Sequence, residues 1–167
     1  KRLGELIAAN GYAMVFGAGN LGLMGETARA ARDGGAPVTG ILPSFLRHIE
    51  PPMQGGEELI ITPDMHQRKD RMETMSDAFI VLPGGLGTMD ELFEVLATAQ
   101  LGVHKKPIIL VNTANYFEPV LALMTHIVTE GFALAAIDRL YRIAATPEDA
   151  MTFLKEALLP SALGETA

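Results

Sequence analysis

The sequence contains no cysteine among its 167 residues, and aromatic residues make up only 6% of it. The absence of cysteine excludes disulfides, thiolate catalysis and cysteine-based zinc sites. No apolar run approaches the roughly 18–20 residues of a membrane span, and no signal peptide opens the chain. We therefore expect the protein to lie in a reducing, cytoplasmic compartment and to have no membrane partner.

Positive charge is scarce as well. Lysine and arginine number 13 against 20 acidic residues, which gives a net charge of −7. The longest basic clusters are the pairs Arg68-Lys69 and Lys105-Lys106. A nucleic-acid polymer requires a broad cationic surface, so we expect no such partner. The charge does not exclude a small anionic ligand, because backbone N–H groups can hold one phosphate whatever the net charge.

The histidines show no metal-ligand spacing either. They lie far apart in the chain, at His48, His66, His104 and His126. Metal motifs in proteins usually place two ligands within a few residues of each other. The positions do not indicate a Ser-His-Asp arrangement, and we expect neither a metal nor a cofactor.

The residues that are present predict a single α/β domain. Short apolar segments bounded by glycine or proline alternate with amphipathic segments, a pattern typical of a parallel sheet covered by helices on both faces. Strands are expected at residues 13–17, 37–42, 57–61, 78–82, 107–111 and 141–144. We expect residues 1–160 to form this Rossmann-like, doubly wound domain, and residues 161–167 to form a tail.

Helices are expected between these strands. The dipeptides Thr62-Pro63 and Thr146-Pro147 each predict a helix with a threonine N-cap and a proline at its first position. Another helix is expected over Met89–Leu101. Right-handed crossovers would place a ligand crevice at the carboxyl ends of the strands. The segment Pro43–Gly56 lacks periodicity, and it is either a surface loop or a lid over that crevice.

The first glycine-rich turn is Gly17–Gly22, which matches G-x-G-x-x-G between a strand and a helix. A dinucleotide site also needs an acidic residue at the end of the next strand. That strand ends in Gly40-Ile41-Leu42-Pro43, so an NAD-dependent dehydrogenase is disfavoured. Two interpretations stay open: the glycines permit tight strand–helix packing, or they line a mononucleotide pocket, with Gly19 as a substrate-binding residue.

The second glycine-rich turn, Pro83–Thr88, is the stronger signal. Gly84, Gly85 and Gly87 carry no Cβ, so the backbone can approach a ligand closely. Thr88 is predicted as an N-cap whose hydroxyl could instead donate to a phosphate oxygen. Free N–H groups and the helix dipole favour an anion at this place. The turn lacks the lysine of a Walker A motif, which argues against NTP hydrolysis.

Acidic residues follow this turn. Asp90 and Glu91 are expected in the first turn of the helix, where the dipole alone could explain both. A carboxylate one turn from a phosphate lies about a ribose's length away, so Glu91 could bind the ribose and favour positive charge at C1′. Glu94 either assists or is solvated.

The helix over Asp64–Ser76 carries an arginine on an apolar stripe. Arg68 lies at helical spacing from the methionines Met65, Met72 and Met75. It must either extend its guanidinium to solvent or meet an anion, and a nucleotide would supply one. Lys69 points away from this stripe and is expected to be solvated. The methionines are either core residues or, near a crevice, partners for a purine.

These motifs resemble those of the Lonely Guy family of cytokinin riboside 5′-monophosphate phosphoribohydrolases, long mislabelled as lysine decarboxylases. Pro83–Glu91 fits the family pattern P-G-G-x-G-T-x-x-E, and Met65–Lys69 fits M-x-x-R-K. Gly17–Gly25 is similar to its first glycine turn, with Ala18 where a third glycine is common. The resemblance runs from Leu3 to Leu154. It also implies an N-terminal strand and a small-residue loop that are absent from this sequence.

The resemblance implies a Rossmann-like homodimer that hydrolyses the N-glycosidic bond of AMP or N6-prenylated AMP to the free base and ribose 5-phosphate. Glu91 would engage the ribose and assist water, and Arg68 would support the sugar and the leaving base. The substrate-binding residues would be Gly84, Gly85, Gly87, Thr88, Met65, Lys69 and Gly19. Decarboxylation of lysine would need a Schiff-base lysine, and only Lys69 is a candidate. Molybdenum-cofactor carriers resemble the motif too, so a non-catalytic carrier is the alternative.

Overall fold

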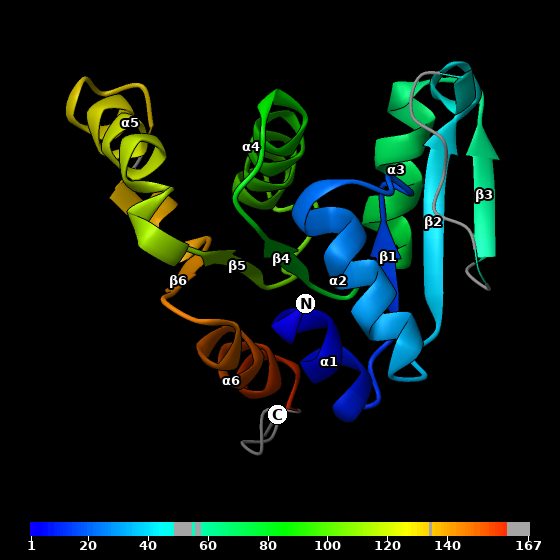
Figure 1. Cartoon of the computed structure of the whole chain (residues 1–167). Helices are drawn as coiled ribbons and strands as arrows, with labels where there is room; N and C mark the ends of the chain where they lie inside the picture. The colour runs from blue at the N-terminus through cyan, green and yellow to red at the C-terminus, as the bar shows by residue number, and fades with distance from the viewer. Residues whose placement is uncertain (49–54, 56–57, 134, 160–167) are drawn as a thin grey trace, which may run out of the picture.

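A computed structural model describes residues 1–48, 55, 58–133 and 135–159 of the chain, and its described part is an α/β fold (Figure 1). An α-helix precedes each strand except β3, which follows β2 after a 3-10 segment, and the described residues contain three such short 3-10 segments. The α-helices are α1 (Arg2–Ala9), α2 (Gly22–Asp33), α3 (Met65–Met75), α4 (Leu86–Gln100), α5 (Glu118–Thr129) and α6 (Pro147–Leu158). The predicted fold class is confirmed.

The strands form two parallel sheets of three strands each. The first sheet has the order β1 (Met14–Phe16), β2 (Val38–Pro43) and β3 (Glu58–Thr62). The second has the order β4 (Phe79–Val81), β5 (Ile108–Val111) and β6 (Arg142–Ala144). The strands lie where they were expected, because continuous apolar runs between glycine and proline turns are typical of buried parallel strands.

The single continuous sheet that the alternation suggested is divided. Within the described residues β1 pairs with β2 and β4 pairs with β5, and no ladder joins β1 to β4. A hollow of 410 Å³ lies between these two strands and is lined along its length by both. The local pattern could not foresee this division, because it says which segments are strands and not which edges meet.

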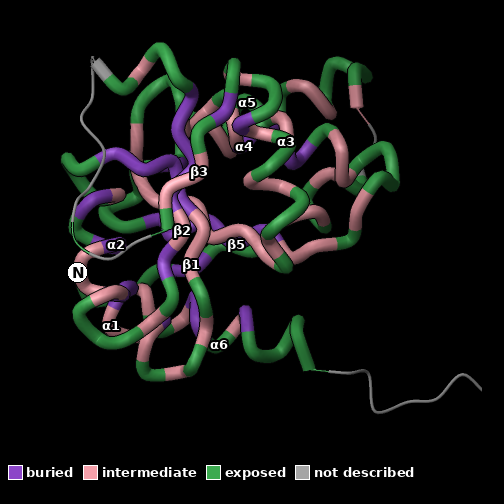
Figure 2. Tube along the Cα trace, turned by 90° about the vertical axis from the view of Figure 1, so that its right-hand side faces the viewer, coloured by how far each residue is buried: buried purple, intermediate pink, exposed green. Residues whose placement is uncertain are grey.

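Two apolar clusters hold the fold together. The larger one joins the sheets: Phe16 and Val38 come from the first, Ile109 and Ala144 from the second, and α1, α2 and α6 close it. The smaller one lies among α4, β5 and α5 and contains the fully buried Phe117. β2 and β5 are the most deeply buried strands, whereas β4 is of intermediate burial throughout; Figure 2 shows the buried trace along β2.

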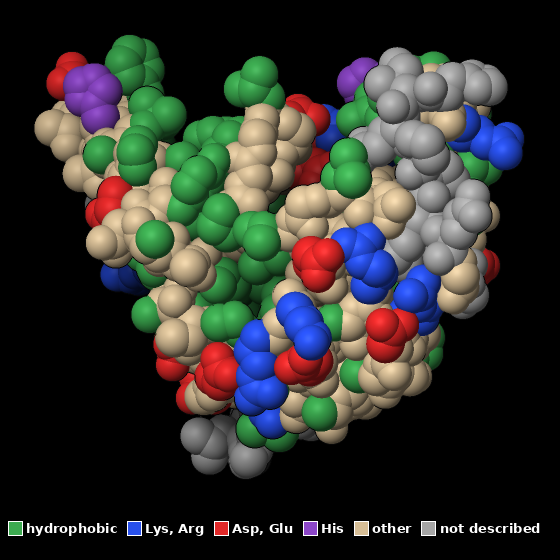
Figure 3. Space-filling model, in the orientation of Figure 1, with side chains coloured by type: hydrophobic (Ala, Val, Ile, Leu, Met, Phe, Trp, Pro, Cys, Tyr) green, Lys and Arg blue, Asp and Glu red, His purple; other side chains and the backbone are tan. Residues whose placement is uncertain are grey.

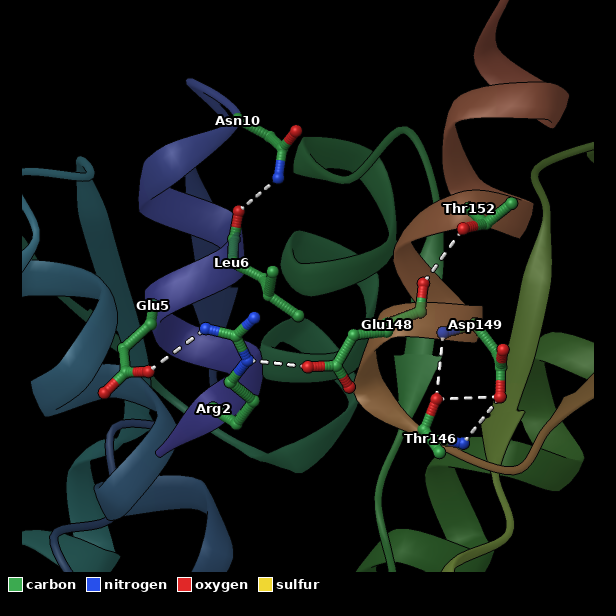
Figure 4. A network of polar contacts seen from close by, with 8 residues as sticks. All are labelled: Arg2, Glu5, Leu6, Asn10, Thr146, Glu148, Asp149 and Thr152. Carbon is green, nitrogen blue, oxygen red and sulfur yellow. Dashed lines mark hydrogen bonds and ion pairs between the residues drawn. The ribbon is translucent and has the colours of Figure 1, made fainter.

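A polar contact between α1 and α6 reinforces the larger cluster at the surface (Figure 4). The Arg2 Nε donates to Glu148 Oε1 at 2.6 Å across the two helices. Thr146 forms a capping box with Asp149 at the start of α6, so the helix start predicted from Thr146-Pro147 is confirmed.

The same prediction for Thr62-Pro63 was wrong. Thr62 still belongs to β3, where it pairs with Pro43, so its backbone cannot also open a helix. Asp64 is the N-cap of α3 instead, and its carboxylate accepts a 2.9 Å hydrogen bond from the Gln67 amide. This bond lowers the pKa of Asp64.

Two further expectations meet the limits of the described residues. The segment Pro43–Gly56 continues from β2 into a 3-10 turn over Ser44–His48, and the rest of it, apart from Gly55, lies outside the described residues, as does the tail 161–167. In the described ranges no helix has the length and apolar character that crossing a membrane requires.

Candidate active site

The turn between β4 and α4 is the first part of the site. The helix begins at Leu86, three residues before the expected Met89, so the prediction of Thr88 as N-cap was wrong. Gly85 takes the N-cap position, with the extended backbone that N-cap residues usually have. The first helical hydrogen bond runs from the Met89 amide to the Gly85 carbonyl at 3.2 Å. The amides of Leu86, Gly87 and Thr88 therefore precede the ladder and carry the positive end of the helix dipole.

The glycines of this turn differ in what surrounds them. A Cβ on Gly84 would lie 2.1 Å from Thr88 Oγ1, so the fold itself needs glycine there. A Cβ on Gly85 or Gly87 would meet nothing within 4 Å, and neither residue has a positive φ. The fold leaves open space beside the free amides, and a tetrahedral anion has the size and charge to use it.

Arg68 and Glu91 form the second part of the site. The Arg68 side chain is buried, and its Nη1 donates to Glu91 Oε1 at 2.5 Å. Its Nε donates to the carbonyl of Ile41, in the carboxyl half of β2, at 3.2 Å. The interpretation that Arg68 extends to solvent is thereby overturned, and the anion it meets within the protein is a carboxylate. α3 thus places a cation across the carboxyl ends of the first sheet.

The first glycine-rich turn makes room for this arginine. A Cβ on Gly17, the residue after β1, would lie 2.0 Å from Arg68 Nη2, so any larger residue there would displace the guanidinium from its present place. Of the two interpretations of this turn, tight packing explains Gly17. Gly19 is buried, and the structure places it outside the lining of the hollow.

The carboxylates sit later in α4 than expected. Asp90 and Glu91 lie in the second turn of the helix, and its first turn contains no acidic residue. The helix dipole acts within the first turn, so it does not explain either residue. Glu91 is instead held by Arg68 and remains about a third exposed, with 34% of its side chain open to solvent. A partly exposed carboxylate that an arginine holds in one orientation at the end of the hollow could contact a bound substrate.

Lys69 lies beside this pair and is not solvated, contrary to expectation. Its side chain is only 13% exposed, and its Nζ contacts Asp90 Oδ2 at 3.0 Å and Glu94 Oε2 at 2.6 Å. The hydrogen bond to Glu94, followed by that to Asp90, raises the pKa of Lys69. Lys69 thereby fastens α3 to α4, and Glu94 is engaged rather than solvated.

The carboxyl end of the hollow brings most of these groups together. Gly17, Lys69, Gly84, Thr88, Glu91 and Glu94 line it there, whereas its deeper part is lined by apolar side chains and the strand edges. Met65 lies half-buried at the first residue of α3, and Gly85 and Gly87 face open space nearby. The described residues contain no group of three or more His, Asp and Glu that could hold a metal ion.

Sequence reasoning missed one polar group at this site. The Tyr116 hydroxyl, from the segment after β5, donates to the Gly84 carbonyl at 2.5 Å. Its position just beyond the carboxyl end of a predicted strand was an available signal, because parallel strands end at a common edge.

Comparison with known proteins identifies relatives of this chain. The family described as possible lysine decarboxylase matches residues 24–154. A probable cytokinin riboside 5′-monophosphate phosphoribohydrolase of Oryza sativa subsp. japonica is 41% identical over 154 residues, which cover 92% of this chain and 63% of that protein. The cytokinin riboside 5′-monophosphate phosphoribohydrolase of Rhodococcoides fascians is 44% identical over 135 residues, covering 80% and 68% respectively.

Solved structures share the fold. The Moco carrier protein from Chlamydomonas reinhardtii superposes with a TM-score of 0.69 at 24% identity, covering 94% of this chain and 83% of that one. The molybdenum cofactor binding protein from Rippkaea orientalis gives a TM-score of 0.67 at 24% identity, covering 93% and 83%. At this identity the likeness concerns the fold alone.

Proposed function

The chain belongs to the family described as possible lysine decarboxylase, and on that premise we propose that it hydrolyses the N-glycosidic bond of nucleoside 5′-monophosphates. The proposed substrates are AMP, N6-prenylated AMP or both, and the products are the free base and ribose 5-phosphate. The resemblance to the Lonely Guy family is confirmed by relatives at 41% and 44% identity. The chain spans 63% of the first of these relatives.

One observation carries the proposal. The buried Arg68 holds the partly exposed carboxylate of Glu91 at 2.5 Å, one helical turn beyond the free amides of α4. A phosphate at those amides would leave the attached ribose within reach of Glu91. The glycines Gly85 and Gly87 leave the space that the phosphate needs.

The chemistry follows from where charge develops. As the bond from C1′ to the base nitrogen lengthens, positive charge grows on the ribose, and a nearby carboxylate stabilises it. A water molecule then adds its hydroxyl group to C1′, and its remaining proton goes to the nitrogen of the leaving base. In this proposal Glu91 binds the ribose and assists the water, while Arg68 keeps the carboxylate aimed and supports the leaving base. Thr88, Met65, Lys69 and Gly19 remain predicted substrate-binding residues.

Two other activities are less well supported. A lysine decarboxylase would require a lysine free to form a Schiff base, and Lys69, which lines the hollow, is engaged by Asp90 and Glu94. A non-catalytic carrier is favoured only by the fold of the molybdenum-cofactor proteins, which says nothing about the site.

The test is to incubate the protein with AMP and with N6-prenylated AMP and to measure free base by chromatography. We expect Glu91→Gln to lower kcat about a thousandfold, since it removes a charge that acts in the transition state. Arg68→Lys should lower kcat as well, because lysine lacks the fork that aims Glu91. Asp90→Asn is the matched control on the same helix, and it should keep most of the activity. Full activity in Glu91→Gln would overturn the residue assignment.

We also propose that the chain forms a homodimer through the face between α4 and α5. Apolar side chains gather in the notch between these helices (Figure 3). Large exposed apolar residues of the two helices and the segments after them are Phe93, Leu101, Val103, Leu123 and Phe132. An apolar patch of this kind marks an association site more often than a solvated one.

Light scattering coupled to size-exclusion chromatography tests this interface. We expect Leu123→Glu on α5 to convert a dimer to a monomer, because it places a charge in the apolar face. Leu158→Glu, a change of another partly exposed leucine at the end of α6, should leave the mass unchanged. A monomeric parent protein would overturn the proposal. The single domain over residues 1–160 is likewise a proposal, supported by the cluster that joins the two sheets, and the cytoplasmic location stays a prediction.

A further inference from the structure

Tyr116 contacts the glycine turn through a bond that the proposed chemistry does not use. Its hydroxyl lies 2.5 Å from the Gly84 carbonyl oxygen. A carbonyl oxygen only accepts hydrogen bonds, so the tyrosine is the donor. Tyr116 comes from beyond β5, and the bond therefore joins the ends of two neighbouring strands.

We propose that Tyr116 is a positioning residue that sets the orientation of the peptide between Gly84 and Gly85, so that the Gly85 amide faces the substrate phosphate. A trans peptide is planar, and its C=O and N–H point in opposite directions. Once the hydroxyl holds the Gly84 carbonyl, the Gly85 N–H must point away from Tyr116. This inference rests on the proposed function, because it assigns that amide to the phosphate of the same substrate.

The peptide needs such a restraint because glycine flanks it on both sides. A peptide between two glycines can rotate with little steric cost, since neither side carries a Cβ. Gly85 in particular has no atom within 4 Å of the place where a Cβ would stand. Without the hydroxyl, part of the population would turn the carbonyl rather than the amide toward an anion, and that orientation is repulsive.

The segment that carries Tyr116 is built to hold it in place. Ala114 and Asn115 adopt left-handed backbone with φ of 54° and 59°, a conformation that costs free energy in residues other than glycine. Phe117 is fully buried, and its ring meets the Tyr116 ring edge-on with centroids 5.3 Å apart. The Asn112 side chain accepts from the Phe117 amide at 2.8 Å. The left-handed turn thus lies between Asn112 and the buried Phe117, and these two residues restrict the movement of Tyr116.

A purely structural role for Tyr116 predicts different behaviour from a positioning role. If the hydroxyl only stabilised the segment, its loss would lower the unfolding temperature and affect kcat and KM without preference. If it orients the Gly85 amide, its loss weakens phosphate binding while the chemical step at Glu91 continues. Tyr116→Phe removes the hydroxyl and keeps the ring contact with Phe117, so it separates the two.

The experiment measures ribose 5-phosphate binding by calorimetry and AMP hydrolysis kinetics for the parent protein, Tyr116→Phe and Tyr12→Phe. Tyr12 precedes β1, at the opposite end of the strands from the glycine turn, and serves as the control. We expect Tyr116→Phe to weaken ribose 5-phosphate binding about tenfold and to raise KM for AMP by a similar factor, with kcat changed about twofold at most. Tyr12→Phe should change neither.

A second measurement follows the Gly85 amide directly. In the parent protein, adding ribose 5-phosphate should shift the Gly85 amide resonance in a nitrogen-15 NMR spectrum, and in Tyr116→Phe this shift should shrink. Equal binding and equal Gly85 shifts in both proteins would overturn the role of Tyr116. A parent protein that hydrolyses AMP without a Gly85 shift would overturn it too. A parent protein that does not bind ribose 5-phosphate and hydrolyses neither AMP nor N6-prenylated AMP would instead overturn the proposed function.

Discussion

The two glycine-rich turns follow β1 and β4, and the surroundings of their glycines differ. In the first turn, a Cβ on Gly17 would collide with the Arg68 guanidinium at 2.0 Å. In the second, a Cβ on Gly85 or Gly87 would meet no atom within 4 Å. The protein itself accounts for glycine at the first turn, whereas at Gly85 and Gly87 it does not. Glycine that the fold does not require is what a close ligand would need, and this difference supports the proposed phosphate site at the second turn.

Among variants of the two glycine-rich turns, the largest effect is expected for Gly17→Ala. The new Cβ would displace the Arg68 guanidinium from Glu91, and such a misplacement should lower kcat/KM about a hundredfold. Because Arg68 is buried, the free energy of unfolding should also fall, by roughly 1–3 kcal/mol. Steady-state kinetics and urea titration measure the two effects.

Gly22→Ala in the same turn is the control for Gly17→Ala. Gly22 has a φ of 63°, and a Cβ there would meet nothing within 4 Å. We expect a loss of about 1 kcal/mol from the left-handed backbone, with catalysis nearly unchanged. If Gly17→Ala behaved like Gly22→Ala, the close approach of Arg68 would not matter for activity.

An intermediate effect is expected for Gly87→Ala, and it should separate stability from activity. Gly87 is in the first turn of α4, where alanine is the better helix former, so the free energy of unfolding should stay equal or rise by up to about 1 kcal/mol. The Cβ would enter the space beside the free amides, and KM for AMP should rise about tenfold. A stabilised variant with unchanged KM would break the comparison, because the open space would then serve no ligand.

The smallest effect concerns α3, the helix that brings Arg68 to the first turn. The amide of Gln67 lowers the pKa of Asp64 below its ordinary value of 3.8. A carboxyl group with a lowered pKa stabilises the fold above the unfolded-state value, and that contribution is lost as the pH falls through the folded-state pKa. Asp64→Asn keeps a capping side chain but does not titrate.

Urea unfolding of both proteins at about pH 6 and about pH 3 tests the role of Asp64. We expect the parent protein to be more stable than Asp64→Asn at the higher pH, and the difference in stability between the two proteins to shrink at the lower pH. A difference that is independent of pH would mean that the charge of Asp64 does not contribute to the cap.

The local parts of the fold were predictable, and the reasons lie in particular residues. The apolar run before Pro83 predicted β4, and Thr146-Pro147 predicted the start of α6. The predicted starts of α3 and α4 were wrong, because the threonine in each local motif has another place in the folded chain. Thr62 is held in β3 by its pairing with Pro43, and Gly85 rather than Thr88 is the N-cap of α4.

By itself the sequence determined the α/β class, the two glycine turns and the acidic and basic residues of the site, because such patterns depend on neighbours a few positions apart. Only the tertiary structure decided that Arg68 would meet Glu91, 23 positions away, and that Tyr116 would reach Gly84, 32 positions away. It also divided the strands into two sheets. Contacts of this kind arise when packing brings separate strand ends to one edge, and no local pattern encodes which side chains then meet.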